Sequence, residues 1–239
     1  MDRRHARAHG HRRSRSLRRI PIFPLPGTVF FPHVALPLHL FEPRYRQMGE
    51  DASKGDGLLV VVLLKPGWKR DYEGTPAVHK MATLGRLVEH ERLEDGRLNI
   101  VLRGVERVRI LEPEASELAE GKLYRVRSIE TAREHPPEPS EATSALLRAV
   151  RSRWKELLHK SGRFEPESQR VSEDASFEEL VNHVATFVDL PPHVKQELLD
   201  EDNLIIRAAR LEGHLDEQLK FWRTLSRFRA FSPDDPSVN

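Results

Sequence analysis

The first 135 residues contain short apolar runs separated by turn-forming residues, which is the pattern of β-strands. The run at residues 58–64 is apolar on both faces and predicts a central, fully buried strand. Residues 20–23 predict an edge strand, because Pro21 has no N–H to donate to a neighbour. Further strands are predicted at residues 34–40, 79–93, 97–102 with a continuation to 110, and 123–129.

Turn-forming residues indicate how these strands are joined. Asp95-Gly96 lies between two alternating runs and predicts a β-hairpin. Pro43 suits the first position of a short helix over residues 43–53, which Gly55 and Gly57 end. Six or seven short strands with one small helix predict a compact, barrel-like sheet.

After a proline-rich linker at residues 135–140, the hydrophobic period becomes helical. Ser140 is predicted to cap a helix that runs to about residue 160, and Ser176 with Glu179 forms a capping box for a second helix. A short helix after Pro191 and a last helix starting at residue 202 or 203 complete the chain. The fold class is therefore α+β: a β-rich pseudo-barrel with one short helix, followed by a C-terminal α-helical bundle.

Charge is distributed unevenly along the 239 residues. Residues 1–19 hold eight of the 39 Lys and Arg side chains but one of the 37 Asp and Glu, so the remainder is mildly acidic. We expect a disordered basic tail over residues 1–19, a β-rich subdomain over 20–135, a helical subdomain over 136–229 and a disordered tail over 230–239. With no cysteine, no membrane span and no signal peptide, the sequence predicts a cytoplasmic protein without disulfides.

Three groups of motifs resemble the N-terminal, substrate-binding domain of Lon proteases over about residues 20–225. The first is Ile20-Pro-Ile-Phe-Pro-Leu-Pro-Gly27 with Phe31-Pro32 and Leu36-Pro-Leu-His-Leu-Phe-Glu-Pro-Arg-Tyr-Arg46. The second is Leu84-Gly-Arg-Leu-Val88, Asp95-Gly-Arg97 and Leu102-Arg-Gly-Val-Glu-Arg107, and the third is Lys195-Gln-Glu-Leu-Leu-Asp200 with Arg207. The resemblance implies a PUA-like β-rich subdomain, a helical subdomain and a surface for exposed apolar segments of other proteins.

Most motif residues have a structural interpretation. Glu42 precedes the helix and suits its positive end, and it could pair with Arg46 four residues later. Phe41 and Tyr45 have the spacing of one apolar face, and Gly104 is expected at a turn or bulge between strands. We expect the motif to maintain the fold, with direct ligand contact as the alternative; its residues are Phe41, Glu42, Pro43, Arg44, Tyr45, Arg46 and Gly104.

Catalytic motifs are missing from the sequence. It has no phosphate-binding loop, no Gly-x-Ser-x-Gly elbow, and no second histidine to complete a zinc motif after His90-Glu91. The Ser–Lys dyad of Lon lies in a peptidase domain of its own, for which this chain has no room after its helices. We therefore expect no enzyme activity, no cofactor and no metal site.

The leading hypothesis is a non-catalytic polypeptide-binding or adaptor protein that acts through an apolar patch and free strand edges. Trp68 and Tyr72, in the polar loop after the buried strand, are the candidate contact residues; alternatively both rings fold back onto the barrel. The expected partners are unfolded or partly folded polypeptides, or Lon protease itself. No binding to a membrane is expected. The alternative function is nucleic-acid binding by the basic tail, because PUA-like folds elsewhere bind RNA.

Overall fold

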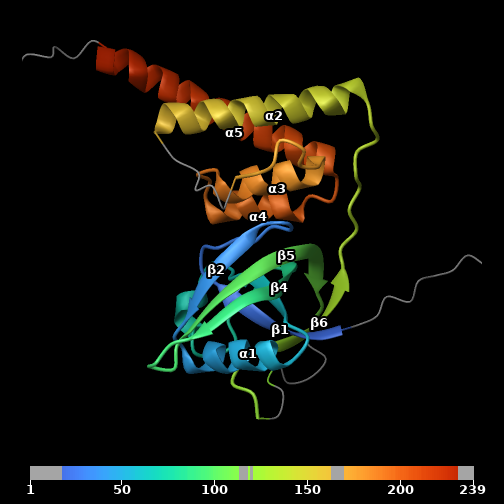
Figure 1. The fold of residues 1–239 in the computed structure, drawn as a ribbon, viewed down its shortest axis with the longest axis vertical. Helices are drawn as coiled ribbons and strands as arrows, with labels where there is room; N and C mark the ends of the chain where they lie inside the picture. The colour runs from blue at the N-terminus through green and yellow to red at the C-terminus, as the bar shows by residue number, and fades with distance from the viewer. Residues whose placement is uncertain (1–17, 113–117, 119–120, 163–169, 231–239) are drawn as a thin grey trace, which may run out of the picture.

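The computed structural model describes residues 18–112, 118, 121–162 and 170–230. A β-rich subdomain and a helical subdomain are stacked along the long axis of the molecule (Figure 1). The elements are β1 (Arg18–Leu25), β2 (Ala35–Leu40), α1 (Pro43–Lys54), β3 (Leu58–Leu63), the short 3-10 helix η1 (Trp68–Asp71), β4 (Met81–Arg92), β5 (Leu98–Ile110), β6 (Val126–Thr131), α2 (Glu141–Ser161), α3 (Phe177–Phe187), α4 (Pro192–Asp200) and α5 (Leu204–Ala230).

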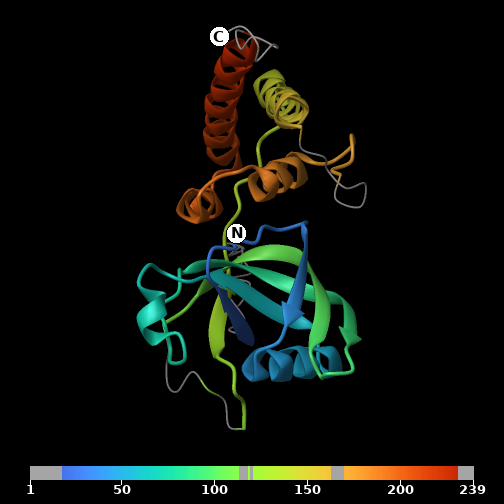
Figure 2. The ribbon, with the colours of Figure 1, turned by 90° about the vertical axis from the view of Figure 1, so that its left-hand side faces the viewer.

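The six strands form one mixed sheet in the order β2-β5-β4-β3-β1-β6, and a further pairing of β5 with β6 curls the sheet into a barrel. Among the strands that the structure describes, β1 and β3 pair in parallel and the other pairs are antiparallel. Helix α1 lies across the end of the barrel that is farther from the helical subdomain (Figure 2). Every residue of β3 is buried, so the predicted central strand is confirmed, as is the α+β fold class.

The position of β1 corrects two predictions. It is not an edge strand, because it pairs with β3 on one side and β6 on the other. Pro21 is tolerated there because it faces Val126 near the end of the β6 pairing, while the ladder with β3 begins one residue later. The strand also starts at Arg18, so Arg18 and Arg19 are ordered parts of the sheet rather than tail. The other residues of the two predicted tails, 1–17 and 231–239, lie outside the described part.

The β4–β5 hairpin turns at Gly96, as Asp95-Gly96 predicts. Strand β5 then continues without interruption through Gly104. The register shifts there, because Gly85 faces Gly104 while Leu84 faces Glu106, two residues further on. The predicted bulge is therefore present, but within one long strand rather than between two.

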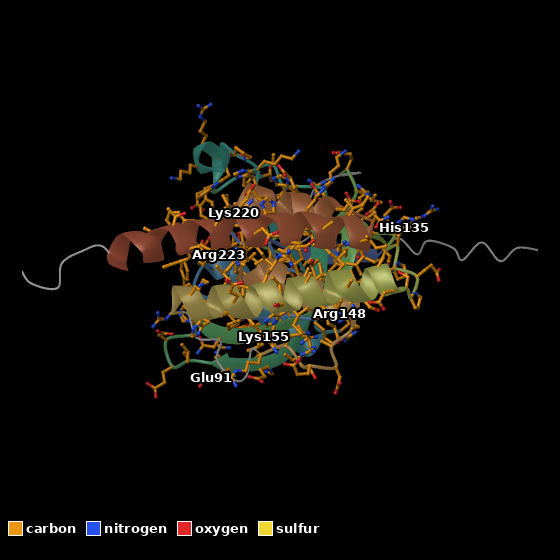
Figure 3. The ribbon with its side chains drawn as sticks, turned by 90° about the horizontal axis from the view of Figure 1, so that it is seen from above. Glu91, His135, Arg148, Lys155, Lys220 and Arg223 are labelled. Carbon is orange, nitrogen blue, oxygen red and sulfur yellow. The ribbon has the colours of Figure 1, made fainter. Side chains whose placement is uncertain are left out.

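Helix starts agree with the capping signals in the sequence. The Ser140 hydroxyl accepts from the Thr143 N–H, and Ser176 and Glu179 form the expected reciprocal box. The Asn203 side chain accepts from two amides at the start of α5. Seen from above, α2 and α5 lie side by side, and they carry the exposed charged residues Arg148, Lys155, Lys220 and Arg223 (Figure 3). No helix in the described ranges is both long and apolar enough to cross a membrane.

The two subdomains share one hydrophobic core. Phe31, Leu63 and Met81 of the barrel belong to the same buried cluster as the apolar faces of α2 to α5. The side-chain amide of Gln196 on α4 adds a hydrogen bond to the Met81 carbonyl oxygen, at 3.1 Å. Because the subdomains share this core, we expect them to unfold together.

An ion pair at this junction predicts a dependence of stability on pH. Nε2 of His33 lies 3.2 Å from the Glu178 carboxylate. This hydrogen bond raises the pKa of His33 against the opposing effect of burial, with Glu179 raising it and Arg103 lowering it. The same bond lowers the pKa of Glu178. The stability from His33 is thus present below its ordinary pKa and is lost as the pH rises through the raised value.

We expect His33→Asn to lower the melting temperature more at about pH 6 than at about pH 8.5. Asparagine is the suitable replacement because His33 has a positive φ of 67°, which asparagine tolerates. As the pH falls through the lowered pKa of Glu178, the difference should shrink again, because the Glu178 carboxylate then becomes protonated. Thermal melts of both proteins across this range test the prediction, and a difference that does not change with pH contradicts it.

Candidate functional site

A groove of about 460 Å³ opens on the barrel beside the N-terminus of α1. It lies among the ends of β1 and β3, the segment 72–76 and the segment 123–125. Its apolar walls include two leucines that are unusually exposed, Leu118 at 48% and Leu123 at 58%. The other apolar and aromatic side chains in the groove are those of Ile22, Pro24, Pro43, Tyr45, Leu64, Tyr72, Pro76 and Tyr124.

A cluster of three polar side chains borders the groove. The Glu42 carboxylate accepts from Nε of Arg44 at 3.0 Å and lies 2.8 Å from its Nη2. The Tyr72 hydroxyl donates to the other Glu42 oxygen at 2.6 Å, and Arg44 donates to the Tyr72 carbonyl oxygen at 3.1 Å. The Arg44 guanidinium also stacks 4.7 Å from the ring centres of both Tyr45 and Tyr72. These contacts neutralise the charges locally and connect segment 72–76 to α1.

Burial, together with the hydrogen bond to Glu42, raises the pKa of Tyr72. The phenol is therefore neutral at physiological pH and acts as a hydrogen-bond donor. The predicted pairing of Glu42 with Arg46 is wrong, since Glu42 pairs with Arg44. Glu42 is the N-cap residue and Pro43 opens the helix, as expected, but the Glu42 side chain makes no capping hydrogen bond.

Phe41 and Tyr45 do not share an apolar face, which corrects a second prediction about the motif. Tyr45 is buried and packs against Phe23 with ring centres 4.5 Å apart. Phe41 is 61% exposed, because it precedes the N-cap residue and does not follow the helical repeat. Helical spacing therefore does not apply to this pair.

Of the two predicted contact residues, Tyr72 lines the groove and Trp68 does not. Trp68 opens η1 and meets the Tyr72 ring edge-on at 5.4 Å. Both side chains are half-buried, so they are neither fully exposed for contact nor fully packed onto the barrel. No signal in the sequence indicated the two leucines of the groove. Leu123 lies within the strand predicted over residues 123–129, but β6 starts only at Val126, so Leu123 belongs to the segment before it.

The side chains that line the groove include no histidine, cysteine or serine. No cluster of three or more metal-ligating side chains occurs in the part of the chain that the structure describes. The arrangement suits the binding of an apolar group beside the paired charges of Glu42 and Arg44. A second apolar cavity of about 350 Å³ lies on the helical subdomain, beside Trp154, Phe221 and Trp222.

A sequence model of the family described as the ATP-dependent protease La (LON) substrate-binding domain matches residues 19–217. The chain belongs to this family. The predicted resemblance is thereby confirmed, and the match covers the substrate-binding domain alone. The cluster of Glu42, Arg44 and Tyr72 thus lies in a Lon-type domain.

Comparisons with individual proteins agree with this assignment. The chain is 26% identical over 205 residues to a Lon protease of Flavobacterium johnsoniae, covering 84% of this chain and 24% of that protein. It spans about a quarter of the length of the curated relatives it matches. The N-terminal domain of a Lon protease from the Mycobacterium avium complex has the same fold, with a TM-score of 0.62 and 14% identity over 83% of this chain and 98% of that one. A Lon N-terminal domain protein from Xanthomonas campestris gives 0.58 and 21% over 81% and 96%.

Proposed function

We propose that this Lon-type domain binds exposed apolar segments of unfolded or partly folded polypeptides in the groove beside α1, as a recognition or adaptor module without a covalent step. The observation that carries the proposal is the pair of exposed leucines in a groove where Glu42 and Arg44 neutralise each other. An apolar side chain that enters is covered by Leu118 and Leu123, while Glu42 and Arg44 stay paired with each other. Family membership supports a role in substrate recognition.

The affinity of such a site should be modest. Burying one leucine-sized side chain contributes roughly 1.5–3 kcal/mol, whereas an extended ligand loses much conformational freedom on binding. We therefore expect dissociation constants of about 1 μM or weaker. Tyr72 contributes to one wall of the groove, and Trp68 supports its ring from outside the groove.

We propose unfolded polypeptides, or a Lon protease, as the partners of the groove. The curated relatives that match this chain are named Lon protease and are about four times as long as the matched region. Nucleic-acid binding by the basic tail over residues 1–19 stays a prediction, because residues 1–17 lie outside the described part. No feature of the groove supports it.

Leu123→Arg is expected to weaken polypeptide binding at least about tenfold, because it places a charge in the apolar wall. Its effect on stability should be small, since Leu123 is 58% exposed. The measurement is fluorescence anisotropy of a labelled, permanently unfolded protein such as casein, with thermal melts alongside. The matched control is Val88→Arg, the same change at a residue that is 50% exposed on β4 and does not line the groove.

Equal loss of binding in Leu123→Arg and Val88→Arg would show that the groove is not the site. Absence of binding by the wild-type protein across a panel of unfolded polypeptides would remove the proposed function itself.

A further inference from the structure

The leucine-bearing wall of the groove is attached to α1 by side chains rather than by a strand ladder. The Gln47 amide nitrogen donates to the Gly121 carbonyl oxygen at 3.0 Å, and its carbonyl oxygen accepts from the Leu123 N–H at 2.7 Å. One side chain thus forms two hydrogen bonds with the backbone on either side of Lys122, as a paired strand would.

A second attachment lies one helical turn further along α1. The Asp51 carboxylate accepts from Nζ of Lys122 and from the Tyr124 hydroxyl, both at 2.8 Å. Residues 47 and 51 are four apart, so they lie on the same face of α1. Together they hold residues 121–124, which place the Leu123 side chain in the groove.

We propose that Gln47 is a positioning residue for polypeptide binding, with Asp51 as its partner on α1. Both polar backbone groups that Gln47 engages are satisfied within the protein, so this wall presents the Leu123 side chain to a ligand and not its backbone N–H. The inference rests on the proposed function of the groove. It adds that the affinity for apolar segments depends on a residue that does not line the groove.

The physical reason is preorganisation. A leucine on a segment that is already held in place contributes its full contact area, whereas a leucine on a loose segment must first be ordered. Removing both hydrogen bonds of Gln47 should therefore weaken binding by roughly tenfold. The free energy of ordering residues 121–123 is then subtracted from the free energy of binding. The barrel itself should remain folded, because α1 packs through Tyr45, Met48 and Ala52 on its other face.

Gln47→Met tests the inference, because methionine keeps the length of the side chain and the helix propensity but makes neither hydrogen bond. We expect faster hydrogen exchange at the Leu123 amide, roughly tenfold weaker binding of labelled casein in anisotropy, and an almost unchanged thermal melt. The matched control is Gln218→Met on α5, which removes one hydrogen bond to the Asp189 carbonyl oxygen beside the other cavity. It should bind casein as the wild type does.

The outcomes separate this inference from the proposed function. If wild-type protein binds and Gln47→Met binds equally well, the positioning role is overturned while polypeptide binding stands. Unchanged exchange at the Leu123 amide also overturns it, because the segment is then held by other contacts. If the wild type does not bind any unfolded polypeptide, both proposals fail together.

Discussion

Replacing Glu134 by glutamine is expected to lower the free energy of unfolding by about 3 kcal/mol, because two buried arginines share its carboxylate. Nε of Arg107 on β5 lies 2.5 Å from one carboxylate oxygen, and Nη2 of Arg207 on α5 lies 2.8 Å from the other. The side chains of Arg107 and Arg207 are 1% and 0% exposed, so water cannot solvate their charges once the Glu134 carboxylate is removed. Glu134 therefore joins the barrel to the helical subdomain.

The remaining partners of these arginines are too few to compensate. Arg107 also donates to the carbonyl oxygens of Leu199 and Arg133 and pairs with Asp202 at 2.9 Å. Arg207 donates to the Asn182 side chain and to the Glu201 carbonyl oxygen. In the Glu134→Gln variant, Arg107 keeps its pair with Asp202, and the carboxylate that still attracts Arg207 is that of Glu178. Burial already lowers the pKa of Arg207, which shows how unfavourable its charge is at this site.

Chemical denaturation of the wild type and the variant measures this effect. Glu94→Gln is the matched control, because it makes the same change of charge at an exposed residue of the β4–β5 turn. It should change stability by less than about 0.5 kcal/mol. A loss below about 1 kcal/mol for Glu134→Gln would contradict the view that this carboxylate is essential to the junction.

Gly104→Ala is expected to destabilise the fold by about 3 kcal/mol, because the added methyl group has no space. A Cβ at this position would lie 2.3 Å from the Phe31 carbonyl oxygen and 2.8 Å from Cα of Pro32. Both are backbone atoms, so no side-chain rotation relieves the contact. The bulged strand and the loop that precedes β2 approach each other here, with a hydrogen bond from the His33 N–H to the Gly104 carbonyl oxygen at 2.9 Å.

Gly213→Ala is the control with the opposite expected sign. Gly213 lies within α5, and a Cβ there would meet nothing within 4 Å. Alanine should stabilise the helix by roughly 0.5–1 kcal/mol. Denaturation midpoints of the two variants should therefore move in opposite directions. A neutral Gly104→Ala would show that β5 and the residue 31–32 loop separate easily.

Local signals in the sequence predicted most of the elements. Continuous apolar character identified β3, and Asp95-Gly96 identified the hairpin. Ser140, Ser176 and the pair Asp202-Asn203 marked the starts of three helices. Each depends on residues a few positions apart, whose interactions do not need the rest of the fold. The prediction from Pro21 was wrong because it also used local information alone. The missing N–H suggested an edge strand, but the pairing with β3 begins one residue after Pro21, so no N–H is needed there.

The groove was harder to predict because it joins residues distant in the chain. Glu42 is held by Tyr72, 30 residues later, and Gln47 holds Leu123, 76 residues later. Arg107 and Arg207 belonged to recognised motifs, but their hydrophilic side chains gave no sign that both would be buried around Glu134. Such contacts depend on the register of the barrel and on the docking of the helices, which spacing alone does not reveal.

Photochemical cross-linking of the full chain to casein that carries a photoreactive group tests the central claim most directly. Mass spectrometry of the products identifies the segments of this protein that the bound polypeptide touches. We expect cross-links concentrated at residues 42–45, 72–76 and 123–125, and their loss in Leu123→Arg. Cross-links concentrated instead on Trp154, Phe221 and Trp222, in the cavity of the helical subdomain, would contradict it.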